Sequence, residues 1–292
     1  MLPKVFLAPI SEFTSLPFRM LCYKYGAEAA VAPLVNVTAI TKRKEAIEAV
    51  DVDAAEKHVG VQLFGKEPAE FEYAAKVVAA RFPFVKFIDI NCGCPAKNII
   101  AVGAGCVLLK SPARVAKIVA AAKKCGLPVS VKLRLQDEKK TIAFCRKMEA
   151  ARADFIAVHG RTVAQGYAGV ADWKTICKIK AVVEIPVIGN GDILSAAQGQ
   201  EKIVSGCCDA FMIGREAMKN PLCFSDKRLE TMQQQKKLLK EYATLCEKFD
   251  MLNITDLRLK SLAVFRGTEG RAALRLKISE TKTAEGLLEL IS

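Results

Sequence analysis

A thiol in an irregular turn is the most reactive group in the sequence. Cys94 lies in NCGCP, where Gly93 and Pro95 break the regular backbone just after an apolar run that ends at Cys92. A free thiol titrates near about 8.5, so at neutral pH Cys94 holds its proton and can donate it as a general acid. With a base close by it would act as a nucleophile instead. Cys92 is the weaker candidate, because alternation with Ile90 assigns it to the strand itself.

A lysine and a glutamine interrupt two further apolar runs. Lys132, in VSVKLR, alternates with Val131 and Leu133 and therefore faces inward if those residues face covering helices. An inward lysine is costly without an anionic partner, and a flavin fits because its reduced form carries negative charge near N1 and O2. Gln62, in VGVQLF, could donate to and accept from a flavin ring edge. The alternatives are a lysine that reaches solvent and a glutamine satisfied by the backbone.

Polar residues also follow three later apolar runs. GNGD at 189–192 and IGR at 213–215 place glycines where a backbone can approach an anion, and Arg215 adds a fixed charge. This pattern predicts a phosphate site, although each glycine alone could simply turn a tight corner. His159 and Arg161, in HGRT, are reasonable ligands for a phosphate, a flavin edge or a base.

These residues all lie at or near the carboxyl ends of short apolar runs that indicate parallel strands. The eight runs are VFLAPI at 5–10, AAVAP at 29–33, VGVQLF at 59–64, FIDINC at 87–92, VSVKLR at 129–134, FIAVHG at 155–160, IPVIGN at 185–190 and AFMIG at 210–214. Amphipathic stretches such as PAEFEYAAKVVAARF and PARVAKIVAAAKKC separate them. Eight β-then-α units favour a closed (β/α)8 TIM barrel over an open doubly wound sheet, with the reactive residues gathered at the carboxyl ends of the strands.

The residue pattern changes after the last of these apolar runs, from alternating strand and helix signals to helix signals alone. TMQQQKKLLKEYATLCEKFDML, ITDLRLKSLAVFRG and GRAALRLKISETKTAEGLLELI all have helical spacing and lack β-branched runs. We therefore expect a TIM-barrel catalytic domain over residues 1–225 and a small all-helical domain over residues 226–292.

Charge and composition limit the possible functions. The 292 residues include 44 Lys and Arg against 31 Asp and Glu, a net charge of +13, which favours a polyanionic partner such as nucleic acid over a membrane surface. No HExxH, GxSxG or GxxxxGK motif supports a metalloprotease, hydrolase or nucleoside triphosphatase. Two histidines rule out a multi-histidine metal site. Eleven unpatterned cysteines, no long apolar run and no signal peptide predict reduced thiols in a soluble cytoplasmic protein.

The sequence resembles the tRNA-dihydrouridine synthase family of FMN-dependent TIM-barrel enzymes. The resemblance covers nearly the whole chain. It runs through APISEFTSLPFR, VGVQLFG, DINCGCPAKNIIAVGAGCVLL, VKLR, HGRTVAQGYAGVADW, PVIGNGDI, MIGREAMKNP and the tail segment LAVFRGTEGRAALRLKI.

The resemblance implies a role for each matching residue. It makes Cys94 the catalytic general acid. The implied FMN-binding residues are Pro9, Ile10, Ser11, Gln62, Lys132, His159, Asn190, Gly191, Asp192, Gly214 and Arg215, and the implied substrate-binding residues are Asn91, Lys97, Arg134 and Arg161.

The resemblance also implies the reaction. NADPH reduces FMN, the flavin N5 hydride goes to C6 of a uridine in tRNA, and Cys94 protonates C5. The uridine must be flipped or looped out to reach the barrel mouth. The expected partner is tRNA, bound in part by the helical tail. We expect neither a membrane nor a metal as a partner, and we expect the protein to be a monomer. Two alternatives are a dihydroorotate-dehydrogenase-like FMN barrel that acts on a free pyrimidine, and a non-catalytic RNA-binding protein without flavin.

Overall fold

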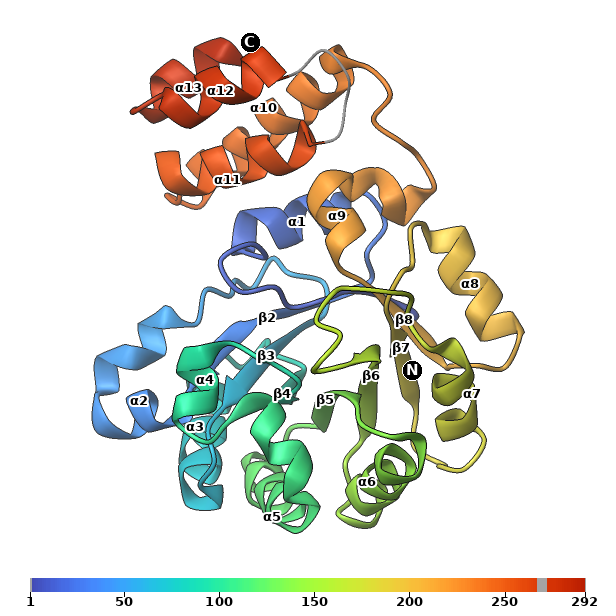
Figure 1. The fold of residues 1–292 in the computed structure, drawn as a ribbon. Helices are drawn as coiled ribbons and strands as arrows, with labels where there is room; N and C mark the ends of the chain where they lie inside the picture. Colours follow the sequence, from blue (N-terminus) through green and yellow to red (C-terminus); the bar gives the residue numbers. More distant parts are fainter. Residues whose placement is uncertain (1, 267–271, 292) are drawn as a thin grey trace.

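The computed structural model, which describes residues 2–266 and 272–291, contains a closed parallel barrel (Figure 1). Its strands pair in chain order and close between β1 and β8, and they are β1 (Val5–Leu7), β2 (Ala29–Asn36), β3 (Val59–Phe64), β4 (Phe87–Cys92), β5 (Val129–Leu135), β6 (Phe155–Thr162), β7 (Val187–Asn190) and β8 (Ala210–Ile213). Each lies within or overlaps the run that predicts it, so the (β/α)8 TIM-barrel prediction is confirmed.

Helices surround the barrel in the order that the sequence pattern predicts. They are α1 (Leu16–Lys24), α2 (Val37–Lys42), α3 (Pro68–Arg81), α4 (Lys97–Ala101), α5 (Pro112–Ala122), α6 (Glu138–Ala150), α7 (Trp173–Lys180), α8 (Ala196–Val204) and α9 (Arg215–Lys219). Short 3-10 turns are η1 (Lys44–Ala49), η2 (Gly105–Lys110), η3 (Lys123–Cys125) and η4 (Pro221–Ser225). Within the described ranges, no helix is long and apolar enough to cross a membrane.

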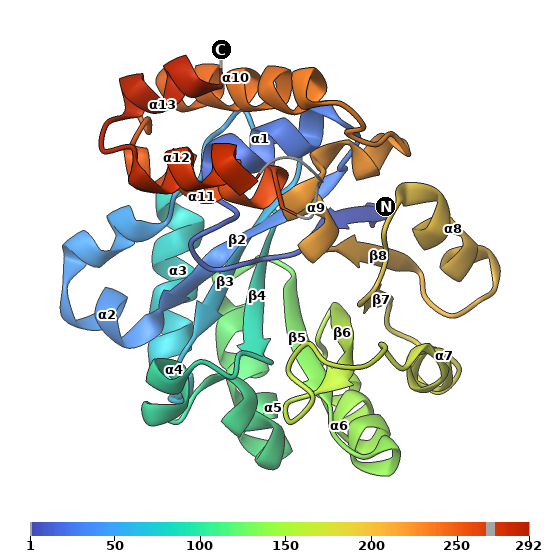
Figure 2. The same ribbon diagram turned by 45° about the horizontal axis from the view of Figure 1, so that its top comes forward.

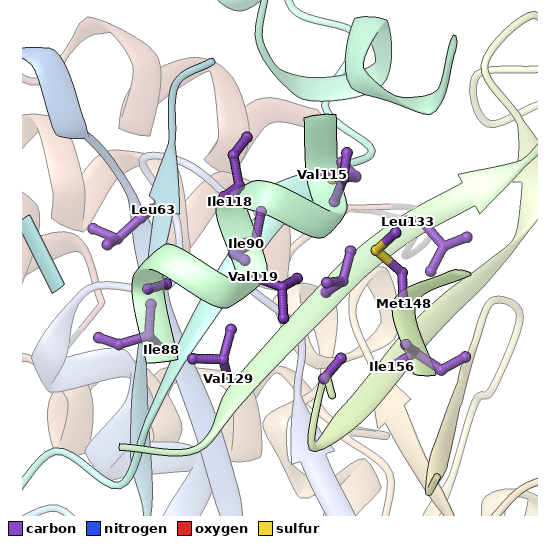
Figure 3. Packing of buried hydrophobic residues seen from close by; sticks show 14 of the residues in the cluster. Leu63, Ile88, Ile90, Val115, Ile118, Val119, Val129, Leu133, Met148 and Ile156 are labelled. Carbon is purple, nitrogen blue, oxygen red and sulfur yellow. The ribbon is translucent and has the colours of Figure 1, made fainter. Parts of the chain in front are cut away.

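Alternation along the strands separates two apolar layers. The outward residues of β3, β4 and β5, such as Leu63, Ile90 and Leu133, are buried against α5 and α6 (Figure 3). Inside the barrel, the amino-terminal ends of the strands are filled by apolar side chains that include Phe6, Phe87 and Phe155. Because the lower interior is packed, the polar inward residues gather at the carboxyl ends, where the barrel opens.

The C-terminal helices lie together against α1 and α9 on one side of the barrel (Figures 1 and 2). They are α10 (Met232–Lys248), α11 (Ile254–Val264), α12 (Ala272–Glu280) and α13 (Ala284–Leu290). The third predicted helical segment is two helices rather than one, because Thr283 starts α13 by accepting a hydrogen bond from Gly286 N. Residues 267–271, which belong to the second and third predicted segments and to the family-like tail segment, fall outside the described residues.

A buried lysine anchors α11 to the loop between β1 and α1. Lys260 has a 2% exposed side chain and donates to Asp256 Oδ1 at 2.6 Å. Its Nζ lies 4.3 Å from the ring centroid of Phe13 and 5.6 Å from those of Phe18 and Tyr242. A desolvated ammonium among aromatic faces is stabilised by the ring quadrupoles. The C-terminal helices are thereby tied to the β1–α1 loop, which contains Pro9.

One cysteine prediction is wrong. Cys177 on α7 and Cys207 in the loop before β8 form a disulfide, whereas the sequence pattern predicts that all thiols are reduced. Their separation of 30 residues matches no spacing motif, and only the packing of α7 against the end of the barrel brings them together. The other nine cysteines, which include Cys94, are free.

Candidate active site

A row of hydrogen-bonded polar residues crosses β3, β4 and β5 inside the barrel. The strand register places Gln62 beside Asp89 and Asp89 beside Ser130. Asp89 accepts from Gln62 Nε2 and from Ser130 Oγ, each at 2.6 Å. Gln62 Oε1 in turn accepts from Asn91 Nδ2 at 2.8 Å. Gln62 is therefore held by side chains, and the alternative that backbone groups satisfy it does not apply.

Asn91 shapes the turn that carries the reactive thiol. Its Oδ1 accepts from Gly93 N at 3.2 Å and from Cys94 N at 3.0 Å. The carbonyl oxygen of Cys94 accepts from Cys106 N at 3.0 Å, which attaches the turn to η2. Cys94 is partly exposed at the barrel mouth, whereas Cys92 is buried in the layer under the helices. The structure thus separates the two thiols as alternation predicts.

Lys132 points into the barrel, as predicted. Its Nζ donates to Asn190 Oδ1 at 3.3 Å, and Asn190 Nδ2 donates to the carbonyl of Met212 at 2.8 Å. Burial lowers the pKa of Lys132 to about 8, although the nearby carboxylate of Asp89 and the thiol of Cys94 favour its charged form. At neutral pH an ammonium therefore lies at the mouth beside the thiol, with one neutral hydrogen-bond acceptor.

His159 is a neutral group at this site. It is 8% exposed, and burial together with the charges of Lys132, Arg134, Arg161 and Arg215 lowers its pKa to about 2. A neutral imidazole can donate one hydrogen bond and accept another, but it cannot act as an acid near pH 7.

Two arginines fold the loop between β6 and α7 across the mouth. Arg134 Nη1 donates to the carbonyls of Thr162 (3.3 Å) and Gly166 (2.7 Å). Arg161 donates to the carbonyls of Ala168 (3.1 Å) and Gly169 (2.7 Å). The loop presents Tyr167, 59% exposed, whose ring centroid lies 5.4 Å from the Arg134 guanidinium and 4.8 Å from that of Arg215. An exposed aromatic face flanked by cations thus stands at the edge of the mouth.

Asp192 is already engaged by protein groups. Its two oxygens accept from Arg161 at 2.7 Å and from Arg215 at 2.9 Å, and Ala171 N donates at 2.8 Å. Although partial burial raises the pKa of Asp192, these hydrogen bonds and charges keep it below its usual range. The carboxylate therefore orients two arginines and would repel a phosphate that it contacted directly.

Two of the glycines predicted to approach an anion, Gly191 and Gly214, directly precede Asp192 and Arg215 in the sequence. Gly191 has φ +123°, and a Cβ there would meet Ala171 Cβ at 2.8 Å and His159 Cδ2 at 3.1 Å. A Cβ at Gly214 would meet Ala8 Cβ at 3.4 Å. Any larger residue at position 191 would displace its neighbours, so this corner needs glycine for its own packing.

The remaining predicted residues lie at the edge of this cluster. Pro9, Ile10 and Ser11 form the start of the loop after β1, where Ile10 N donates to Thr14 Oγ1 at 3.1 Å. Lys97 is exposed at the first residue of α4, and no hydrogen bond or ion pair within the described ranges joins it to the other site residues. The structure therefore brings most of the predicted residues together. Ser11 and Lys97 are exposed, and no hydrogen bond or ion pair within the described ranges joins Lys97 to the others.

The sequence pattern assigns no role to two residues of this site: Asp89, and Tyr167 with its contacts to two arginines. Asp89 lies two residues before Asn91 on the same strand, so alternation alone could have placed it inside the barrel. Tyr167 carries no periodic signal because it lies in a loop.

The donor set fits an anionic cofactor. Lys132, Arg134, Arg161 and Arg215 surround the mouth. Two carboxylates lie near them: Asp192 accepts from Arg161 and Arg215, and Asp89 accepts from Gln62 and Ser130. The buried Nη1 of Arg161 has no partner in the described part of the chain. An unpaired buried donor is costly, and an anionic acceptor would satisfy it. In the same part of the chain, no cluster of three or more His, Cys, Asp or Glu could hold a metal ion.

Comparison with known proteins places this site in a family. A family model described as "Dihydrouridine synthase (Dus)" matches residues 6–268. The chain is 35% identical over 227 residues to the probable tRNA-dihydrouridine synthase of Rhodobacter capsulatus, covering 75% of this chain and 69% of that protein. It is also 35% identical over 229 residues to tRNA-dihydrouridine synthase B of Pseudomonas aeruginosa, covering 76% and 68%.

Solved structures share the barrel at low identity. Histamine dehydrogenase from Rhizobium sp. 4-9 superposes with a TM-score of 0.55 and 10% identity, covering 83% of this chain and 49% of that one. The old yellow enzyme homologue from Zymomonas mobilis gives 0.50 and 12%, covering 78% and 90%. These two likenesses concern the fold alone. Because the family match spans most of the barrel and part of the C-terminal helices, the chain belongs to the dihydrouridine synthase family, whose general reaction is the flavin-dependent reduction of uridine.

Proposed function

We propose that this protein reduces the C5–C6 bond of specific uridines in tRNA, with FMN as the flavin and NADPH as the reductant. The observation that carries the proposal is the position of the Cys94 turn, held by Asn91 at the barrel mouth beside the inward ammonium of Lys132. A small-molecule reductase needs no net charge of +13, whereas a tRNA substrate explains that charge.

Two groups of residues at the mouth would bind the flavin and deliver the proton. Lys132, Gln62, His159 and the corner formed by Gly191, Gly214 and Arg215 would hold the flavin, which supplies the hydride when it is bound. The Cys94 thiol would deliver the proton to C5 of the uracil. Because Cys94 is partly exposed, solvent can return a proton to the sulfur after each turnover.

The substrate side lies between the Cys94 turn and the loop after β6. Asn91 and Arg134 supply donors at the mouth, and Tyr167 offers an exposed ring on which a flipped base could stack. Arg161 would support this side indirectly, because it ties the loop to Asp192. Lys97, exposed at the start of α4, would contact an RNA phosphate.

We further propose that residues 1–225 form the catalytic domain and residues 226–292 a tRNA-binding domain. The contacts of Lys260 with the β1–α1 loop would then connect tRNA binding to the flavin side of the barrel. We also propose that the enzyme acts as a monomer in the cytoplasm, where its tRNA substrate is found.

The test compares the Cys94→Ala variant with the wild-type protein and a Cys125→Ala control. Cys125 is a free, half-buried thiol on η3, which precedes the amino-terminal end of β5 and so lies at the other end of that strand from the mouth. The expected result is that all three proteins contain FMN and that NADPH bleaches it equally, while Cys94→Ala alone forms no dihydrouridine in unmodified tRNA. Loss of flavin reduction in Cys94→Ala would refute its role as acid. A colourless wild-type protein would favour the non-catalytic RNA-binding alternative, and NADPH oxidation without any dihydrouridine would favour a small-molecule substrate.

A further inference from the structure

A buried carboxylate lies directly beneath the proposed reaction site and has no part in the chemistry described so far. Asp89 is 2% exposed and accepts from Ser130 Oγ on one side and Gln62 Nε2 on the other, each at 2.6 Å. Burial raises its pKa, while these two hydrogen bonds and the charge of Lys132 act in the opposite direction. A carboxylate in this position is costly unless its neighbours are arranged around it.

Because both of its oxygens accept hydrogen bonds, Asp89 dictates how the next two amides must point. A carboxylate only accepts, so the NH2 group of Gln62 must face Asp89 and its Oε1 must face away. That Oε1 accepts from Asn91 Nδ2 at 2.8 Å, so Asn91 Oδ1 is left to accept from the N–H groups of Gly93 and Cys94. With Asp89 charged, only one orientation of each amide satisfies every neighbour.

We propose that Asp89 is a positioning residue, whose carboxylate orients the Gln62 and Asn91 amides and thereby holds the turn that carries Cys94. The inference rests on the proposed function only in treating Cys94 as the proton donor, since the hydrogen-bond chain itself is independent of any ligand. One N–H of each amide is used within the chain, so the second N–H makes both residues donors toward the mouth. Donors of this kind match the carbonyl oxygens of a uracil or a flavin ring.

An Asp89→Asn substitution separates this role from simple packing. The new amide has nearly the same shape. In the described part of the chain Asp89 is the acceptor of the Ser130 hydroxyl, so while Ser130 keeps donating there the new amide presents its oxygen to Ser130 and its NH2 to Gln62. Gln62 must then turn over and present its NH2 to Asn91, and Asn91 in turn presents its NH2 to the N–H groups of the turn. Each amide in this series of hydrogen bonds is thus reversed, and Cys94 N loses its acceptor.

The double variant Asp89→Asn with Gln62→Glu restores the series of hydrogen bonds from position 89 to Asn91. The carboxylate introduced at position 62 accepts from the new amide on one side and from Asn91 Nδ2 on the other, so Asn91 keeps its orientation. The pair of substitutions conserves net charge and side-chain size. Gln62→Glu alone places two carboxylates against each other and serves as the opposite control.

The readout is the rate at which iodoacetamide alkylates Cys94 in the full-length protein, measured peptide by peptide with mass spectrometry. Cys125, a half-buried free thiol on η3, provides the internal reference within the same molecule. We expect Asp89→Asn to raise the ratio of Cys94 to Cys125 alkylation about tenfold, the factor expected when one buried hydrogen bond is lost. We expect the double variant to return the ratio to within about twofold of wild type.

If the ratio is unchanged in Asp89→Asn, the measurement is repeated with Asp89→Ala, which offers Gln62 no acceptor however the Ser130 hydroxyl turns. An unchanged ratio there too overturns the proposal, and a raised one supports it. A double variant that keeps a raised Asp89→Asn ratio also overturns it. If Asp89→Asn fails to fold by circular dichroism, a folded double variant with the wild-type ratio supports the proposal, and an unfolded one overturns it. The assay requires neither tRNA nor turnover. A protein that shows the expected ratios but makes no dihydrouridine would refute the proposed function alone.

Discussion

Gly105→Ala should displace the reactive turn without touching the site directly. Gly105 has φ +64°, and a Cβ there would lie 2.5 Å from the carbonyl oxygen of Cys94 and 2.8 Å from Ile99 Cγ2. To reach an ordinary contact of about 3.4 Å, that carbonyl must shift by about 0.9 Å. A misplacement of about 1 Å can cost about 100-fold in rate. We therefore expect kcat for dihydrouridine formation to fall by about 10- to 100-fold.

The matched control is Gly126→Ala. Gly126 has φ +84°, so alanine carries the same left-handed backbone cost of about 1–2 kcal/mol, but a Cβ there meets no atom within 4 Å. Gly126→Ala should lose roughly 2–8 °C in Tm and Gly105→Ala at least as much, whereas only Gly105→Ala should lose turnover. Equal turnover in the two variants, measured with saturating tRNA, would show that the carbonyl contact does not position Cys94.

Further predictions concern charge at the mouth and the attachment of the C-terminal helices. Because Lys132 is cationic below its pKa of about 8 and neutral above it, flavin affinity measured by fluorescence titration should fall as the pH rises through about 8. Lys132→Met should remove that step, and an unchanged step would assign it to another group. The pKa of His159 is about 2, so the pH profile of turnover between pH 5 and 9 should keep its shape in His159→Gln, even where its amplitude falls. Lys260→Met should lower the free energy of unfolding by about 3 kcal/mol in urea denaturation, because it leaves Asp256 without its cation, whereas the exposed Lys248→Met should change it by less than about 0.5 kcal/mol.

Much of the barrel could be predicted because its signals are local. The apolar runs that form the strands, the inward direction of Lys132 and the placement of Cys94 after β4 all follow from alternation along a few residues. Strand ends were less predictable: β1 ends at Leu7, three residues before its apolar run does. A run of apolar residues continues into a loop whenever the loop is buried, so hydrophobicity alone does not mark where pairing stops.

The amino-acid sequence by itself determined which residues face the barrel interior, because side-chain direction in a strand depends only on position along the chain. Which of those residues touch was decided by the tertiary structure, since contact between Gln62, Asp89 and Ser130 depends on the register of three strands far apart in sequence. The pairing of Asp192 with two arginines depends likewise on how the carboxyl end of β6 and the segments after β7 and β8 converge. The Cys177–Cys207 disulfide and the docking of Lys260 among aromatic rings required whole helices to pack in place. Such contacts join segments whose separation leaves no periodic trace, and they form only when the chain has closed on itself.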